Sequence, residues 1–314
     1  MIGSEAADLD NRAGRLGRVV QDASVDIDCP LVKVVTIPER EFSLLQGAAA
    51  AYVWQSLCKA FPGEVFPLAP DILDLARDHI VIIPNRTPNG LLLPKSETFL
   101  SFNLVQGAVA EAFKACGLAA HFSRVQAPCN VRVVDSSGSE ETDGRPYSSA
   151  KPHTDVWNGE PVSAVLFNIP ILGNPAAVKM AYYAPRHFPK ELMGPLTDYN
   201  LGACVLEDTE SYDIPFSFRH IYVSDSLCLH QTVRAADGIR LSIDFRAIPV
   251  ETLTGEKTST DNSKADYVDI QHWLNMGSSM VLTSDEPIDA FHRKARGEPV
   301  SKVDITTTAI KAVG

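Results

Sequence analysis

The stretch IRLSIDFRAI, residues 239–248, is the last of five short runs that predict β-strands. Each run is rich in Val, Ile, Phe and Tyr and is bounded by Gly, Pro, Asp or Ser, as strands are. The other runs are CNVRVVD (129–135), SAVLFNIPIL (163–172), AVKMAYYA (177–184) and HIYVSDSLCLH (220–230). Alternate side chains of a strand lie on one face, so Arg240, Ser242 and Arg246 would share a face of the last one.

Two stretches that precede Pro128 predict helices, over residues 41–61 and 96–117. Their apolar positions recur at helical spacing, and the second stretch ends at a glycine. Helices followed by antiparallel-type strands favour one α+β domain with a β-sandwich or barrel core. We expect residues 26–314 to form this domain. Residues 1–25 are polar and unpatterned and predict a flexible N-terminus.

Composition narrows the class of partner. The 314 residues carry a net charge of −11, which argues against nucleic acid or an anionic membrane as partner, because both reward a basic surface. There is no signal-peptide pattern and no apolar run near the ~20 residues of a membrane span. The six cysteines are scattered without a CxxC pair and predict reduced thiols. We therefore expect a cytoplasmic protein with a small-molecule substrate; the oligomeric state stays open.

The segment KPHTDVWNGEP, residues 151–161, contains the first candidate site residues, His153 and Asp155. An H-x-D pair alone is often a turn. About 75 residues later His230 ends a predicted strand. Two imidazoles and one carboxylate on one face of a metal form the triad that leaves open positions on Fe(II). The H-x-D spacing suits a strand end, where both side chains can converge on one ion.

Ten residues after His230 comes Arg240, followed by Ser242. On one face of a strand, these two side chains would hold a carboxylate, which an arginine can bind through two parallel hydrogen bonds. Arg246 has the same parity and is a rival for this role.

The order H-x-D, His, Arg-x-Ser resembles that of the Fe(II)/2-oxoglutarate-dependent dioxygenases, over roughly residues 125–250. HTDVWNGEP, NIPILG and RLSIDFRAI are most similar to the oxygenases of bacterial carbohydrate-biosynthesis clusters. The resemblance implies a double-stranded β-helix core (jelly-roll, cupin-like) with the two helices buttressing one sheet. It implies Fe(II), 2-oxoglutarate and O₂ as cofactors. His153, Asp155 and His230 would be the iron ligands, and Arg240 and Ser242 would bind the distal carboxylate of 2-oxoglutarate.

Other candidate residues have two interpretations each. Asn130 and Arg132 would reach the cosubstrate or the substrate, or lie on a solvated face. Trp157 would wall the iron pocket or simply pack. Lys151 and Arg145 would attract an anionic substrate or be solvated. The strand residues whose faces the sequence leaves open are Asn168, Tyr182 and Tyr183.

The predicted reaction is hydroxylation of an unactivated C–H bond of an amino acid, a sugar or a specialised metabolite in biosynthesis. Asp155 fills the position that halogenating relatives leave open for chloride. Desaturation, ring closure and epimerisation begin with the same hydrogen abstraction and stay open. So does a non-catalytic metal-binding sensor of the same fold; a cupin-type isomerase or lyase would usually carry more histidines. The polar loop 136–152 predicts a lid over the site.

Overall fold

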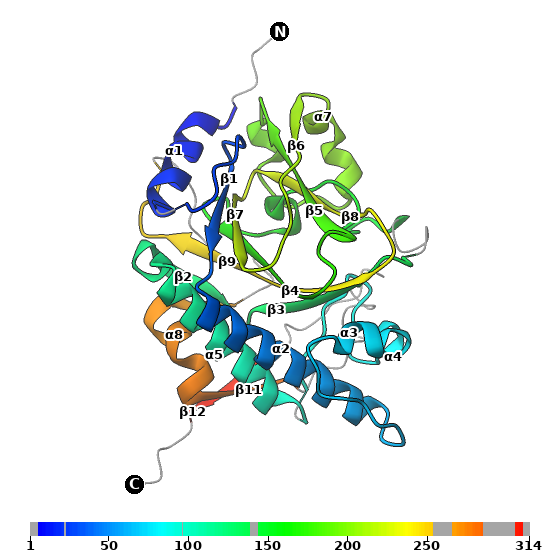
Figure 1. Ribbon diagram of the computed structural model, residues 1–314. Helices are drawn as coiled ribbons and strands as arrows, with labels where there is room; N and C mark the ends of the chain where they lie inside the picture. The colour runs from blue at the N-terminus through cyan, green and yellow to red at the C-terminus, as the bar shows by residue number, and fades with distance from the viewer. Residues whose placement is uncertain are drawn as a thin grey trace.

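Two antiparallel sheets face each other in the computed structural model, and a layer of helices covers the larger one (Figure 1). The structure describes residues 6–21, 23–95, 97–138, 144–253, 266–284 and 305–309. The larger sheet has the strand order β1-β7-β4-β9-β2-β10, with β3 also paired to β9. Its strands are β1 (Val32–Thr36), β2 (Phe122–Ala127), β3 (Asn130–Asp135), β4 (Val165–Gly173), β7 (His220–Asp225), β9 (Ile239–Pro249) and β10 (Asp266–Asp269).

The smaller sheet has the order β6-β5-β8 and lies on the other side of the larger sheet from the main helices (Figure 1). Its strands are β5 (Val178–Pro185), β6 (Thr209–Tyr212) and β8 (Leu229–Arg234). A separate pair consists of β11 (Met280–Ser284) and β12 (Ile305–Ala309). The helices are α1 (Leu9–Val19), α2 (Glu39–Ala60), α3 (Ile72–Leu75), α4 (Arg77–Ile82), α5 (Phe99–Ala115), α7 (Ala203–Leu206) and α8 (Ile270–Ser279). Short 3₁₀ turns are η1 (Leu118–His121), η2 (Asp155–Asn158), η3 (Lys190–Leu192) and η4 (Tyr199–Gly202).

The main core lies between the larger sheet and the helices α2, α5 and α8. On β9 the apolar parity, Leu241, Ile243 and Phe245, faces these helices, and Phe113 of α5 packs edge-on against Phe245 at 5.8 Å. The opposite parity of β9 is polar, yet every residue of the strand is buried. The polar face must therefore be covered by the smaller sheet and the loops between the sheets, and that enclosed face contains the site.

The two helices predicted from the sequence are confirmed as α2 and α5. The predicted run 220–230 is instead two strands, β7 and β8, which belong to different sheets. A tight turn separates them: the Asp225 carboxylate accepts a hydrogen bond from Leu227 N at 2.9 Å, and Cys228 N donates to the Asp225 carbonyl at 3.0 Å. A continuous apolar run does not reveal such a change of sheet.

The prediction of a flexible N-terminus over 1–25 is wrong for residues 9–19, which form α1. Asp8 caps this helix by accepting a hydrogen bond from Asn11 N at 3.0 Å. Its buried Arg12 and Arg15 bond to the Asp225 carboxylate at 2.8 and 3.3 Å. The polar composition of this segment did not predict a helix, because the residue that its arginines bind, Asp225, lies more than 200 residues away in the sequence.

Three further expectations concern the chain as a whole. All six cysteines are free, as the sequence predicts. Among the described residues, no helix is both long enough and apolar enough to cross a membrane. Of the predicted lid 136–152, residues 139–143 lie outside the part that the structure describes.

Candidate active site

His153 and His230 lie opposite each other because their backbones pair. His153 N donates to the His230 carbonyl at 3.0 Å, and His230 N donates to the His153 carbonyl at 2.8 Å. Two residues further along β8, Thr232 N donates to the carbonyl of Ser149 at 2.7 Å. The segment that leads into His153 is thus attached to β8, and the two imidazole rings have their centroids 4.5 Å apart.

The sequence predicted that Asp155 lies at a strand end. In the structure it is instead the first residue of the 3₁₀ turn η2. The turn closes at Gly159, whose positive φ of 94° is a conformation that favours glycine. The side chain still reaches the histidines: Asp155 Oδ1 is 4.0 Å from His230 Nε2. A turn, rather than strand alternation, therefore brings the carboxylate to the imidazoles.

Both imidazoles present Nε2 to the site. His153 Nδ1 is 2.7 Å from the Lys151 carbonyl and His230 Nδ1 is 3.3 Å from the Cys228 carbonyl, so each Nδ1 carries the proton that it donates. Burial lowers the pKa of His153 to about 3, with His230 contributing in the same direction. Burial likewise lowers the pKa of His230. Neutral imidazoles fixed in this tautomer are what a metal requires of its histidine ligands.

Arg246 holds the Asp155 carboxylate through two hydrogen bonds, Nε to Oδ2 at 3.1 Å and Nη2 to Oδ1 at 2.7 Å. Its Nη1 donates to Asp244 Oδ1 at 2.7 Å. Burial alone would raise the pKa of Asp155, but Arg246 and the histidines bring it below its ordinary value. Arg246, the predicted rival for the cosubstrate, is thus placed on two carboxylates of the protein itself.

Asp244 is a site residue that the sequence pattern did not single out, although it has the same strand parity as Arg240, Ser242 and Arg246. Its carboxylate accepts hydrogen bonds from Asn130 Nδ2 and Arg132 Nε, both at 2.9 Å. Burial raises the pKa of Asp244, but the positive charges of Arg132 and Arg246 lower it by a larger amount. The pKa of Asp244 is therefore well below its ordinary value. Asn130 and Arg132 therefore point into the site, where they hold Asp244.

A second group on the same polar face, the Arg240 cluster, consists of Arg240, Ser242 and Tyr182. Arg240 is fully buried; its Nη1 donates to the Val178 carbonyl at 2.7 Å and its Cζ lies 5.1 Å from the ring centre of Phe216. Arg240 Nε and Nη2, Ser242 Oγ and Tyr182 Oη are buried without a hydrogen-bond partner in the part of the chain that the structure describes.

The pKa of Arg240 is shifted in the opposite direction from that of Arg246, which Asp155 and Asp244 raise. Burial, followed by the charge of Arg132, lowers the pKa of Arg240 to about 10, and Tyr182 is close enough to oppose this shift. Tyr182 also pairs with His230 in the register of β5 and β8, so the cluster adjoins the imidazoles. Buried donors without partners are costly, about 1–3 kcal/mol each, and call for an explanation.

Three further residues that the sequence predicted for the site have different surroundings in the structure. Trp157 is fully buried, donates from Nε1 to the Leu192 carbonyl at 3.0 Å and packs with Phe188 and Tyr199. Lys151 is paired with Asp198 at 3.4 Å. Asn168 is buried opposite Asp244, with its Oδ1 lacking a partner among the described residues.

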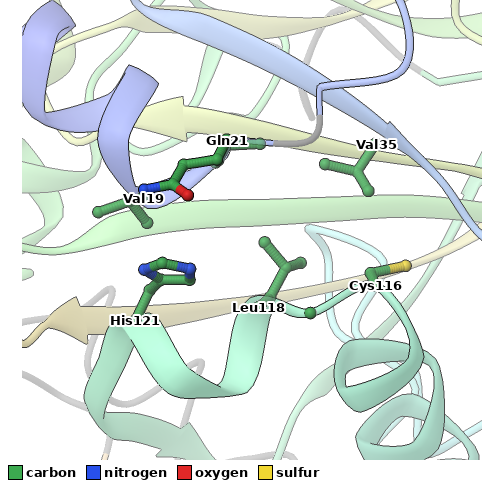
Figure 2. A pocket seen from close by; sticks show the side chains of 8 residues that line it. Val19, Gln21, Val35, Cys116, Leu118 and His121 are labelled. Atoms are coloured by element: carbon green, nitrogen blue, oxygen red, sulfur yellow. The ribbon is translucent and has the colours of Figure 1, made fainter.

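The cavities of the described structure do not all belong to this site. A cavity of about 30 Å³ lies between the end of α1, β1 and η1, lined by residues such as Gln21, Cys116 and His121 (Figure 2). It has room for about one water molecule and contains none of the predicted residues. A larger cavity of about 270 Å³ lies beside β3 and β8.

The predicted iron site depends on the donors of His153, Asp155 and His230. No three ligating side chains within the described ranges are gathered closely enough to form a ready-made metal site. The types of donor fit, because His153 and His230 are neutral with Nε2 available, and a carboxylate bonded to Arg246 retains further lone pairs. At metal–ligand distances of about 2.0–2.2 Å, neighbouring ligands on one face of an ion lie about 3 Å apart, so His230 Nε2 and Asp155 Oδ1, now 4.0 Å apart, have to move closer together to bind one ion.

Comparison with known proteins gives similarity to solved structures only. No protein-family model and no curated protein matches the chain. The non-heme alpha-ketoglutarate-dependent epimerase SnoN from nogalamycin biosynthesis is 14% identical, with a TM-score of 0.36 over 81% of this chain and 92% of its own. The non-heme monooxygenase ThoJ, in its apo form, is 16% identical, with a TM-score of 0.34 over 81% of this chain and 86% of its own.

A third structure, AviO1 from Streptomyces viridochromogenes, is 15% identical, with a TM-score of 0.34 over 81% of this chain and 99% of its own. The first two of these proteins are named as non-heme enzymes. At these identities and TM-scores, function has to be argued from the site's own residues.

Proposed function

We propose that the protein is a non-haem Fe(II)- and 2-oxoglutarate-dependent oxygenase with a double-stranded β-helix core formed by the two facing sheets. The observation that carries this proposal is the Arg240 cluster. It is a buried positive charge whose donors lack partners among the described residues; it lies on the polar face of β9, and its Tyr182 pairs with His230 in the register of β5 and β8.

The donors of the Arg240 cluster match a carboxylate. Arg240 Nε and Nη2, Ser242 Oγ and Tyr182 Oη offer four hydrogen bonds, and a carboxylate has two oxygens with about four lone-pair sites. Bonds of this charge-assisted kind are the strong ones. A carboxylate here would also neutralise Arg240, whose pKa is lowered by burial. This is the requirement that the distal carboxylate of 2-oxoglutarate would satisfy.

His153, Asp155 and His230 would hold the iron. With 2-oxoglutarate and O₂, Fe(II) supplies oxidation of a substrate C–H bond to C–OH, while 2-oxoglutarate becomes succinate and CO₂. The protein's own residues prepare this site: the carbonyls of Lys151 and Cys228 orient the imidazoles, and Arg246 keeps Asp155 ionised and in place. Such outer contacts typically change metal affinity or activity 10–100-fold.

Hydroxylation of a small molecule in biosynthesis is the reaction we propose, with epimerisation, desaturation and ring closure to be separated by identifying the product. A cytoplasmic location and the absence of nucleic-acid or membrane partners are part of the same proposal, supported by the net charge of −11.

The test is succinate formation from 2-oxoglutarate by the purified protein with Fe(II) and ascorbate, in the presence of candidate substrates. His153→Ala and His230→Ala should each reduce turnover by at least about 100-fold and weaken Fe(II) or Mn(II) binding measured by calorimetry. His121→Ala is the matched control, since His121 lies in the small cavity away from the site. Near-normal turnover in either site variant would show that the residue is not a ligand.

A further inference from the structure

The ring of Tyr199 lies flat against the imidazole of His153. The two ring centroids are 4.4 Å apart and the ring planes differ by 3°, so the rings are stacked. Tyr199 is the first residue of the 3₁₀ turn η4, and only 5% of it is exposed. No spacing in the sequence relates this tyrosine to His153, so the contact becomes visible only in the folded chain.

Two contacts of different kinds hold the His153 imidazole. At its edge, Nδ1 is 2.7 Å from the Lys151 carbonyl, and across its face lies the ring of Tyr199. A hydrogen bond at one nitrogen restrains that atom but allows the ring plane to tilt about the bond. A stacked ring fixes the plane. Together the two contacts set the direction in which His153 Nε2 points.

His230 has weaker contacts of the same two kinds. Its Nδ1 is 3.3 Å from the Cys228 carbonyl, a longer edge contact than that of His153. Among the described residues, the ring that packs on it is that of His153 itself, tilted by 54°. Since His230 and Asp155 have to move closer together to bind one ion, His153 is the ligand whose orientation is already set.

The turn η4 is attached to its surroundings, which makes Tyr199 a firm support. Tyr199 N donates to the Pro146 carbonyl at 3.1 Å. Asp198 caps the turn by accepting a hydrogen bond from Asn200 N at 2.9 Å. The ring of Tyr147 packs edge-on against Tyr199, with 5.5 Å between centroids and 84° between planes. The Tyr199 ring is therefore held from its backbone and from its side.

Gly202, at the other end of η4, lets this turn lie directly on Trp157. A Cβ on Gly202 would be 2.2 Å from Cη2 of the indole. Trp157 belongs to η2, the turn that also carries Asp155, and its carbonyl accepts a hydrogen bond from Leu196 N at 2.9 Å. The turn with the candidate carboxylate ligand and the turn with Tyr199 are thus packed against each other.

We propose that Tyr199 is a positioning residue of the candidate metal site, whose ring holds the His153 imidazole in the plane that directs Nε2 to the ion. The assignment rests on the proposed function, because it requires that His153 binds a metal. Contacts that orient a metal-binding histidine typically change metal affinity by about 10–100-fold. The stacked ring carries this role, so the hydroxyl group should be dispensable.

The first experiment is calorimetric titration of the metal-free, full-length protein with Mn(II). Tyr199→Leu removes the stacked ring and should weaken Mn(II) binding by about 10–100-fold. Tyr199→Phe keeps the ring and should bind Mn(II) as the wild type does. Phe61→Leu is the matched control, because Phe61 packs edge-on against a histidine outside the site, His79, with 4.9 Å between centroids.

A second measurement reports the ring geometry without any metal. An aromatic ring stacked on an imidazole shifts the imidazole proton resonances upfield. The Cδ2 and Cε1 protons of His153, assigned by their absence in His153→Ala, should move downfield in Tyr199→Leu and stay in place in Tyr199→Phe. A general loss of stability in a folded variant would not produce this pattern.

A further variant keeps the Tyr199 ring, in case Tyr199→Leu does not fold. Gly202→Ala forces η4 away from the indole of Trp157, so it should weaken Mn(II) binding and move the His153 resonances in the same direction. Unchanged Mn(II) affinity in the folded variants overturns the positioning role. So does an equal loss of affinity in Tyr199→Phe, which would assign the effect to the hydroxyl group.

These results separate the two proposals. Mn(II) binding that is lost in His153→Ala and unchanged in Tyr199→Leu keeps the metal site and overturns the positioning role alone. A wild-type protein that binds neither Mn(II) nor Fe(II) overturns the oxygenase, and the positioning role with it.

Discussion

Arg240 and Arg246 lie six residues apart on the same buried face of β9, and their surroundings differ in kind. Arg246 is bonded to the carboxylates of Asp155 and Asp244. Among the described residues, Arg240 has one carbonyl partner and two nitrogens without a hydrogen-bond partner. A buried charge has to be compensated. For Arg246 the protein itself supplies the counter-charge. For Arg240 we propose that a bound ligand supplies it.

The largest expected effect is on stability, from Arg246→Met. Removing this arginine leaves Asp155 and Asp244 buried with too few partners, which costs about 3–5 kcal/mol for a broken buried pair. Urea denaturation measures the change. Arg18→Met is the control, because the Arg18–Glu251 pair is exposed and screened by solvent, so its loss should change stability little. Equal stability of the two variants would contradict the assigned difference between buried and exposed pairs.

Arg240→Met should have the opposite signature. Without ligand, the protein should be as stable as the wild type or more so, because an uncompensated buried cation is replaced by an apolar side chain of similar volume. Binding of 2-oxoglutarate should weaken by about 2–5 kcal/mol, which is roughly 30-fold to 4,000-fold. Calorimetry and denaturation on the same sample measure both. If Arg246→Met loses 2-oxoglutarate binding while Arg240→Met keeps it, the roles of the two arginines are exchanged.

Acid should destabilise the protein in part by protonating Asp244, the carboxylate beside Arg246. Its pKa in the folded protein is held below the ordinary value by Arg132 and Arg246 despite burial. The unfolded state then binds more protons, so stability from this group is full above the unfolded pKa of about 3.9 and is lost as pH falls through and below it. Asp244→Asn should be less stable at pH 7 and lose less stability between about pH 5 and pH 3. A parallel decline in both proteins would show that Asp244 does not cause the acid sensitivity.

The smallest effect is expected at Lys151, whose charge is partly exposed and pairs with Asp198 at 3.4 Å. Lys151→Ala should change the free energy of unfolding by no more than about 1 kcal/mol. Succinate formation in the presence of the substrate tests the sequence-based prediction that Lys151 contacts the substrate. A rise in apparent KM with unchanged kcat would support that contact, and unchanged kinetics would make Lys151 a surface pair.

Much of the secondary structure follows from local patterns. The apolar spacing of residues 41–61 and 96–117 was enough to predict α2 and α5, and alternation along IRLSIDFRAI placed Arg240, Ser242 and Arg246 on one face. Local patterns did not predict α1, whose buried arginines pair with Asp225, or the turn between β7 and β8, where the chain passes from one sheet to the other. A buried ion pair between residues more than 200 positions apart leaves no periodic signal in either segment.

By itself, the sequence determined which chemistry-bearing residues exist and in which order they come: H-x-D, then His, then Arg-x-Ser. Only the tertiary structure decided which of them meet. Pairing between the backbones of His153 and His230 joins the two histidines, and the turn η2 brings in Asp155. Within the described ranges, carboxylates bind Arg246 and none binds Arg240. Strand parity assigns a side chain to a face and places Asp244 beside Arg246 on β9, but the second counter-charge, Asp155, comes from the turn η2 through a contact that no local spacing encodes.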